Sequence, residues 1–323
     1  MNITSVRNGF TVAIAATFTL GTLSLHAEES YPSKTIQIVV PVNPGGDTDL
    51  NARVLGNHLE EELDASLAIV NVGGGGGSIG MRRVKDAEPD GHSVLFFHGE
   101  GMVPQLAGLV DFGLADFQMV AVAILDDTTV LATHKNAPYT DMDSLVDYAT
   151  ENPNTVEFGM MTGGYPHLVG VGLEDALDID LTMVDIGGNA AKIVALRGGH
   201  TDLINVQYSL VEDYFESGEF INLGLLSQER NPYFEDVPTT AEQGYPVEFN
   251  KFFYFAMPKD TPESIVEKFS AAVERVVNSP EYQEEAAEYY LTPNYLGPED
   301  ATEYVEQQYQ GLQQYQELFL NTN

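Results

Sequence analysis

The chain alternates between short apolar segments and longer segments in which apolar residues recur every three or four positions. A short apolar run bounded by Gly, Pro or Asp predicts a buried strand, and a repeat near 3.6 residues predicts an amphipathic helix. The predicted strands cover Ile36–Val42, Leu67–Val72, Val94–His98, Val156–Gly159, Thr182–Ile186, Leu203–Val206 and Ile221–Leu226. The predicted helices between them cover Leu50–Leu63, Leu168–Leu177 and Ala190–Arg197. This alternation predicts an α/β protein built from βαβ units.

Two further helices are predicted near the C-terminus from their start signals. Thr261 and Ser279 each precede a Pro that we expect at the first helical position. A polar, Tyr- and Gln-rich helix is expected from Pro298 to Leu318. No low-complexity linker interrupts the chain, and its length is near the roughly 250–300 residues at which single cores split. We therefore expect two lobes joined by crossing strands, with a ligand cleft between them.

Four glycine-containing loops each follow a predicted strand and precede a predicted helix. They are Pro44–Asp49, Gly73–Gly80, Thr162–His167 and Ile186–Ala190. Glycine lets a ligand approach the backbone closely, and a helix N-terminus offers free N–H groups with a partial positive charge. Any one of these loops is read best as an ordinary turn. The four together predict a cleft that binds a carboxylate through backbone amides, without needing Arg or Lys.

A competing interpretation comes from the second loop, because Gly75-x-Gly77-x-x-Gly80 fits the dinucleotide-binding pattern. Glu100 follows 20 residues after Gly80, near the end of the next predicted strand. The match lies inside a run of five glycines, where it arises easily by chance. An exported nucleotide-using enzyme built on this loop is the alternative function.

The sequence contains no recognisable motif for catalysis or for metal binding. The seven histidines have no ligand-like spacing, there is no Cys, and no G-x-S-x-G elbow is present. His167 stands out because it starts a predicted helix after Gly163 and Gly164; a helix-start contact and a ligand contact are both open for it. We expect no catalytic residue, no metal and no cofactor.

The N-terminus has the pattern of a cleaved export signal. Arg7 precedes a mostly apolar run from Phe10 to Leu25, and Ala27 provides a small residue before a cleavage site at Glu28. The run is shorter than the roughly 20 apolar residues of a membrane span. We therefore assign residues 1–27 to a signal peptide and expect a periplasmic protein.

The charge balance is strongly acidic, with 14 Lys and Arg against 49 Asp and Glu and a net charge of −35. Such a field repels nucleic acid and anionic membranes. The acids are spread along the chain, as in proteins adapted to high salt, where ions screen self-repulsion. An acidic protein without such adaptation is the other interpretation. For an anion-binding protein, this charge requires a locally favourable pocket.

From Tyr31 to about Tyr315 the chain resembles the Bug (TctC-type) binding proteins of tripartite tricarboxylate transporters. The resemblance rests on five stretches in the family's order. They are Tyr31–Arg53, Ile69–Phe96, Val194–Leu203, Asp236–Pro246 and Ala256–Phe269. It departs from the family pattern at Asp47, where a small residue is common, at Asp185–Gly188, and at the loop before His167.

The resemblance implies a two-lobed, type II-like periplasmic binding fold with mixed sheets flanked by helices. Lobe one would comprise residues 31–131 and 249–323, and lobe two residues 132–248. The chain would be a monomer that captures a small mono- or dicarboxylate and delivers it to membrane transporter subunits; a carboxylate sensor for a signalling system stays open. The expected ligand-binding residues are Pro44, Gly45, Gly46, Asp47, Thr48, Asp49, Gly76, Ser78, Thr162, Gly163, Gly164, Tyr165, His167, Gly188, Asn189 and Asp202.

Overall fold

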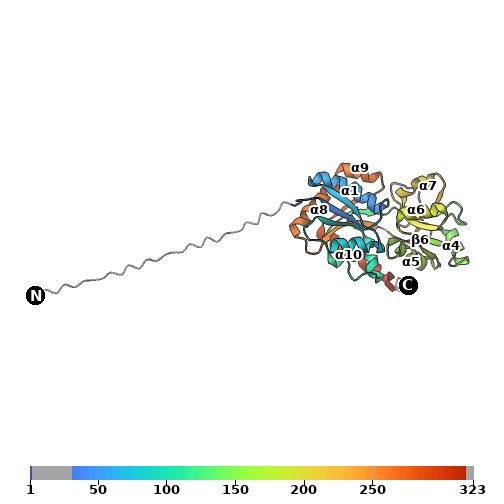
Figure 1. The fold of residues 1–323 in the computed structure, drawn as a ribbon. Coiled ribbons are helices and arrows are strands. Elements are labelled where there is room, and N and C mark those ends of the chain that lie inside the picture. The colour runs from blue at the N-terminus through green and yellow to red at the C-terminus, as the bar shows by residue number, and fades with distance from the viewer. Residues whose placement is uncertain (2–30, 250, 318–323) are drawn as a thin grey trace. The chain divides into compact units, whose positions relative to one another are not determined.

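The computed structural model describes residue 1 and residues 31–249 and 251–317, without the side chain of Glu100. The predicted signal peptide, residues 1–27, lies almost entirely outside the described residues. Residues from Tyr31 onward belong to one compact unit that holds two mixed sheets (Figure 1).

The first sheet has six strands in the order β11-β4-β10-β3-β1-β2. Strands β2, β1 and β3 are parallel, and β10 runs antiparallel to both β3 and β4. The strands are β1 (Ile36–Val40), β2 (Leu67–Asn71), β3 (Ser93–His98), β4 (Phe117–Asp126), β10 (Lys251–Pro258) and β11 (Thr292–Leu296). The helices of this part are α1 (Asp47–Leu63), α2 (Ser78–Lys85), α3 (Val103–Leu106), α8 (Glu263–Val277), α9 (Pro280–Ala287) and α10 (Pro298–Leu312), with the 3₁₀ turns η1 (Gly75–Gly77), η2 (Gly99–Met102), η3 (Leu114–Asp116) and η5 (Gln313–Tyr315).

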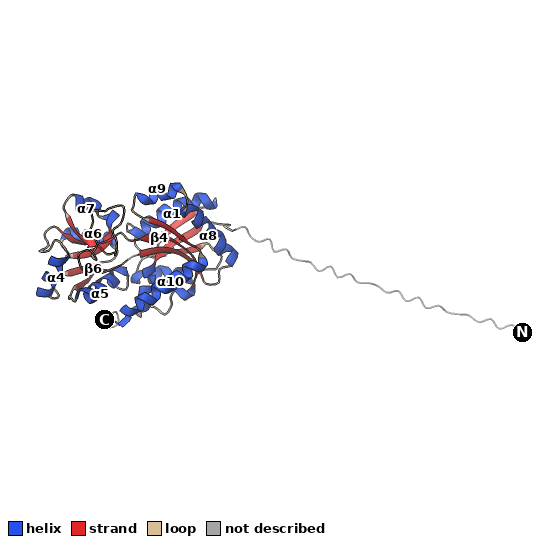
Figure 2. Cartoon of the chain, turned by 180° about the vertical axis from the view of Figure 1, so that it is seen from behind, coloured by secondary structure: helices blue, strands red, loops and turns tan. Residues whose placement is uncertain are grey.

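The second sheet has five strands in the order β7-β6-β8-β5-β9. Strands β7, β6 and β8 are parallel, and β5 is antiparallel to its two neighbours. The strands are β5 (Thr129–His134), β6 (Glu157–Met160), β7 (Thr182–Asp185), β8 (Leu203–Gln207) and β9 (Phe220–Leu225). The helices are α4 (Met142–Glu151), α5 (Tyr165–Leu177), α6 (Asn189–Gly198) and α7 (Glu212–Glu216), with the turn η4 (Tyr208–Leu210). Figure 2 shows helices on the outside of both sheets.

The predicted α/β class is confirmed, and every strand named from the sequence lies within two residues of an observed one. Strands β4, β5, β10 and β11 were not predicted. Of these, β10 is an apolar run that is buried along its whole length, the same pattern that marked the other buried strands.

The chain passes between the two sheets twice. It leaves the first sheet after β4 and enters the second at β5, with only Asp127 and Thr128 between them, and it returns from β9 to β10. The expected lobe boundary after Leu131 thus falls inside β5. These crossings bring the carboxyl ends of strands from both sheets to one region.

The helix-start predictions near the C-terminus had different outcomes. Ser279 caps α9 as expected, because its hydroxyl accepts a hydrogen bond from the N–H of Tyr282. The expectation for Thr261 was wrong. Pro262 itself is the N-cap of α8, the helix begins at Glu263, and the Thr261 hydroxyl donates to the carbonyl of Pro258. The apolar face of α8, which includes Val266, Phe269 and Val273, is buried in the core of the first sheet.

Candidate functional site

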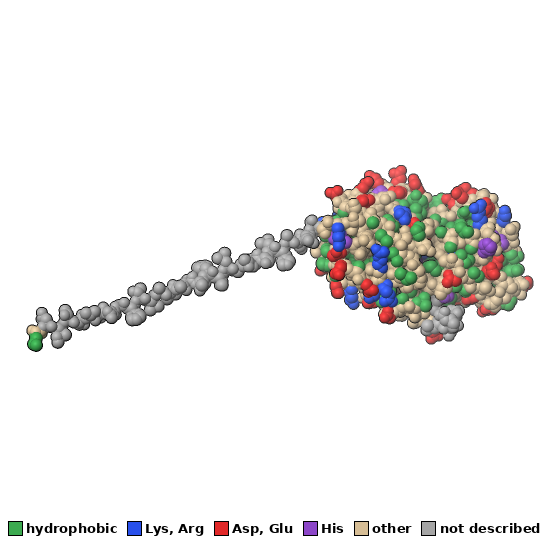
Figure 3. All heavy atoms as spheres, in the orientation of Figure 1, with side chains coloured by type: hydrophobic (Ala, Val, Ile, Leu, Met, Phe, Trp, Pro, Cys, Tyr) green, Lys and Arg blue, Asp and Glu red, His purple; other side chains and the backbone are tan. Residues whose placement is uncertain are grey.

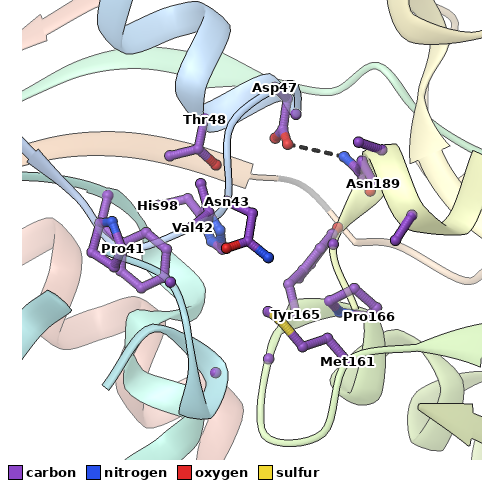
Figure 4. Close-up of a pocket in the computed structure, with 18 of the residues that line it drawn as sticks. Pro41, Val42, Asn43, Asp47, Thr48, His98, Met161, Tyr165, Pro166 and Asn189 are labelled. Atoms are coloured by element: carbon purple, nitrogen blue, oxygen red, sulfur yellow. Dashed lines mark hydrogen bonds between the residues drawn. The ribbon is translucent and has the colours of Figure 1, made fainter. Parts of the chain in front are cut away.

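A cavity of about 170 Å³ lies where the carboxyl ends of strands from the two sheets meet. This is the edge at which open α/β sheets bind their ligands. The cavity is lined by Pro41, Val42, Asn43, Pro44, Gly46, Asp47, Thr48, Gly73, Gly74, Gly76, Phe97, His98, Met161, Gly164, Tyr165, Pro166, Gly188, Asn189, Ala190, Ala191 and Lys251. Figure 4 shows Thr48, Asn43, Tyr165 and Asn189 around this space.

Three helices begin at the cavity wall, and each has a glycine as its N-cap. Gly46, Gly164 and Gly188 precede α1, α5 and α6, and all three line the cavity. None of these glycines has a side chain that could occupy the N–H groups of the first helical turn. The partial positive charges of three helix ends therefore act on the same small space. Such an arrangement favours an anion.

The loops from the two sheets touch at Gly76. A Cβ on this residue would lie 2.1 Å from the carbonyl oxygen of Gly163, and Gly76 has φ +62°. Both the contact and the left-handed backbone require glycine. The glycine run after β2 thus forms a wall of the cavity by direct backbone contact with the loop after β6.

Neighbouring protein atoms lie close to the glycines of the predicted dinucleotide pattern and leave no room for side chains there. A Cβ on Gly77 would lie 2.6 Å from the ring of Phe97, and one on Gly80 would lie 2.7 Å from the carbonyl oxygen of Val72. These two glycines therefore let α2 pack onto the ends of β1 and β2. Two of the three glycines of the pattern thus have packing roles that account for their presence without a nucleotide.

The cavity also contains a buried ion pair. The Lys251 ammonium lies 2.9 Å from one carboxylate oxygen of Asp47, and the two side chains are 4% and 12% exposed. The Asn189 amide donates to the other Asp47 oxygen at 2.9 Å, as Figure 4 shows, and it donates to Gln207 at 2.6 Å. Asp47, Asn189 and Gln207 thus link α1 to the second sheet. The Lys251 ammonium also lies 4.5 Å from the centre of the Tyr165 ring.

The pKa of the Asp47 carboxyl is lowered from its usual value despite its burial. Burial is the largest single influence and raises this pKa, but Lys251, His98 and the backbone N–H of Thr48 together lower it by more. Asp47 is therefore ionised at neutral pH and neutralises Lys251 within the cavity.

The sequence-predicted residues divide into those at the cavity wall and those behind it. Those that line the cavity are Pro44, Gly46, Asp47, Thr48, Gly76, Gly164, Tyr165, Gly188 and Asn189. Those in the same loops but outside the lining are Gly45, Asp49, Ser78, Thr162, Gly163 and His167. Ligand contact by any of them stays a prediction.

Several residues behind the wall hold the loops in shape. The Asp49 carboxylate accepts hydrogen bonds from the Gly45 N–H at 3.0 Å and from Arg53 at 2.8 Å. The His167 imidazole accepts from the Gly163 N–H at 3.2 Å, and burial lowers its pKa. Of the two roles left open for His167, the helix-start contact is therefore observed.

Asp202 lies away from the cavity. It immediately precedes β8, which runs parallel to β6, so it stands at the opposite edge of the sheet from the loop after β6. Its carboxylate accepts from the Glu157 N–H at 3.0 Å and contacts His134. These contacts give Asp202 a structural role at the start of the strand.

Sequence reasoning missed Lys251, His98 and Asn43, and it expected no need for a basic side chain. Lys251 opens an otherwise apolar strand in a chain with only 14 Lys and Arg, which is the one local signal it offers. Its ion-pair partner Asp47 is 204 positions away in the chain. Spacing patterns cannot reveal such a pair.

Other site types were searched for in the described part of the chain. Residues 31–249 and 251–317 contain no group of three or more His, Cys, Asp or Glu side chains placed to hold a metal ion. Within the same residues, no helix has the length and apolar character needed to cross a membrane.

Comparison with known proteins gives concordant results from sequence and structure. The family described as tripartite tricarboxylate transporter family receptor (TctC) matches residues 51–315. The UPF0065 protein of the TAR-I ttuE-ttuC' intergenic region of Agrobacterium vitis is 31% identical, over 85% of this chain and 81% of that protein. Protein BugT of Bordetella pertussis is 28% identical, over 94% of each chain.

Two solved structures resemble this fold closely. The periplasmic binding protein BugD superposes with a TM-score of 0.82 at 26% identity, covering 90% of this chain and 98% of BugD. MatC from Rhodopseudomonas palustris with bound malate superposes with a TM-score of 0.77 at 25% identity, covering 90% of this chain and 99% of MatC.

Proposed function

The chain belongs to the tripartite tricarboxylate transporter receptor family, whose members are solute-binding receptors, and we propose that it captures a small organic carboxylate in the cavity between its two sheets. MatC, which has the same fold, is described with bound malate. The proposal treats this chain as a binding protein without catalytic activity.

The observation that carries the proposal is the convergence of three glycine-capped helix N-termini on one cavity. Backbone N–H groups provide a fixed anion site that needs no net positive charge. This matters because the protein as a whole has a net charge of −35, and Figure 3 shows acidic side chains scattered over the visible face. A carboxylate is therefore attracted locally although the overall field repels it.

A thermal-shift screen of small carboxylates, including malate, followed by calorimetry tests the proposal. A ligand at 100 times its dissociation constant adds about 2.7 kcal/mol to the free energy of unfolding, which is readily measured. Stabilisation by at least one carboxylate is expected. If none of the carboxylates stabilises the protein or gives binding heat, the proposal is wrong.

The role of the helix ends can be isolated at Ala190, the second residue of α6. Ala190→Pro removes one backbone N–H at a helical position where α5 already has Pro166. Loss of a hydrogen bond to a charged group costs about 1.5–3 kcal/mol, so affinity should fall roughly 10- to 150-fold. Ala190→Gly keeps the N–H and is the matched control, with affinity close to wild type. Equal affinities of the two variants would exclude this N–H as a ligand donor.

We extend the proposal to export and assembly. The family relatives include periplasmic binding proteins, and we propose that this chain is exported after cleavage before Glu28 and acts as a monomer in which each sheet with its helices is one lobe. N-terminal sequencing of the protein from a periplasmic extract tests the cleavage. Size-exclusion chromatography with light scattering tests the monomer, and twice the mass of one processed chain would contradict it.

A further inference from the structure

The cavity contains one negative and one positive side chain that are already paired with each other. Asp47 is held by Lys251 and Asn189 through different carboxylate oxygens, each at 2.9 Å. The pair therefore adds no net charge to the cavity, and the three helix N-termini favour an anion there.

Another acidic side chain, Asp126, lies near the pair. Asp126 is the neighbour of Lys251 in the β4–β10 ladder and is 1% exposed. Its Oδ1 accepts from the hydroxyl of Thr128 at 2.6 Å. Burial raises the pKa of Asp126 above its usual value, which favours its neutral form. In either protonation state it supplies no positive charge to a second carboxylate of a ligand.

Much of the remaining wall is apolar. Pro41, Val42, Phe97, Met161, Pro166 and Ala191 line the cavity beside the helix ends. Apart from polar lining side chains such as Asn43, Thr48 and His98, a second ionised carboxylate on the ligand would meet this apolar wall or lie close to Asp47. Both placements are unfavourable, because a buried charge needs a partner and like charges repel.

From this arrangement we propose that the receptor selects small monocarboxylates with an apolar body over dicarboxylates, and that Asp47 sets this selectivity by neutralising Lys251. The inference rests on the proposed carboxylate-binding function and specifies its ligand class. Asp47 is a counter-ion for Lys251 and not for a ligand ammonium group, because Lys251 already compensates its charge.

Two pairs of acids that differ only in one charge test the inference. Succinamate has the shape of succinate, but an amide replaces one carboxylate, and glutaramate relates to glutarate in the same way. Calorimetry with wild-type protein should give at least tenfold tighter binding of the monoanion in the better-bound pair. Butyrate should bind more tightly than 4-aminobutyrate.

Asp47→Asn tests the role assigned to the carboxylate. This variant keeps the side-chain shape but leaves Lys251 without its counter-ion, so the second carboxylate of the dianion can take that place. The affinity ratio of dianion to monoanion should rise at least tenfold. Asp111→Asn removes the same charge at a side chain that is 90% exposed and outside the cavity, and it should leave the ratio within about twofold of wild type.

The outcomes separate this inference from the proposed function. The monocarboxylate assignment is wrong if wild type binds the dianion tenfold more tightly than the monoanion. It is also wrong if Asp47→Asn leaves the affinity ratio of dianion to monoanion unchanged. In both cases carboxylates still bind, so the receptor function stands. Tighter binding of 4-aminobutyrate than of butyrate would also overturn the monocarboxylate assignment. If no acid of either pair and no malate binds, both proposals fail. Should Asp47→Asn not fold, Lys251→Gln gives the opposite test, because it should weaken the dianion more than the monoanion.

Discussion

The contact between the two glycine loops gives a prediction with a built-in control. In Gly76→Ala the new Cβ would lie 2.1 Å from the Gly163 carbonyl oxygen, at a residue whose φ is +62°. Gly199→Ala places a Cβ at φ +66° with no atom within 4 Å. The two variants share the backbone strain, and only the first adds a clash across the cavity.

The magnitudes follow from these two effects. A left-handed backbone costs a non-glycine residue about 1–2 kcal/mol, so both variants should lose about this much unfolding free energy. Overpacking costs about 1–3 kcal/mol more, and it arises only where the loops of the two sheets meet. If ligand binding requires that closed contact, Gly76→Ala should weaken binding about 5- to 150-fold, whereas Gly199→Ala should bind like wild type.

Urea unfolding measures the stability of each variant, and calorimetry with the best carboxylate measures its affinity. The reasoning requires that affinity falls in Gly76→Ala and stays at the wild-type level in Gly199→Ala. Wild-type affinity in Gly76→Ala would show that the loops do not meet in the ligand-bound protein. An equal loss of affinity in Gly199→Ala would show that strain alone accounts for the effect.

Three further predictions concern charge. Because ions screen repulsion among the excess acids, the urea midpoint should rise from low to molar NaCl, and a flat response would remove the high-salt interpretation. Burial lowers the pKa of Lys192 well below 10.5. Between this lowered pKa and 10.5, the unfolded chain binds more protons than the folded protein. The free energy of unfolding should therefore increase as pH rises toward 10.5. Lys192→Met should remove this increase. The prediction is contradicted if the difference in unfolding free energy between wild type and Lys192→Met stays constant with pH. Arg53→Gln breaks the pair between half-exposed Arg53 and buried Asp49, which keeps its hydrogen bonds from Gly45 and Asn71. Calorimetry should therefore show affinity within about threefold of wild type, and urea unfolding a loss of about 1 kcal/mol. Abolished binding would indicate a charge-paired ligand.

Much of the site's backbone could be predicted from local sequence. The loops at Gly46, Gly164 and Gly188 were identified because a strand pattern, a glycine and a helix pattern follow one another within a few residues. Their shared position at one cavity follows from the rule that ligands bind at the carboxyl ends of strands in open α/β sheets. Asp202 was expected from a family-like motif and not from this pattern; it precedes a strand and lies at the opposite edge of the sheet.

The sequence by itself determined the α/β class, the positions of most of the parallel strands and the glycine N-caps, because each depends on side-chain periodicity or on backbone freedom within a few residues. Only the tertiary structure decided the pairing of Asp47 with Lys251, the contact of Gly76 with Gly163 and the apolar wall beside them. These features join residues as far as 204 positions apart. The energies of these features arise from burial between distant residues, which produces no periodic pattern in the sequence. Asp47 and Lys251 would be solvated separately in the unfolded chain, and they become partners only when the fold brings them together.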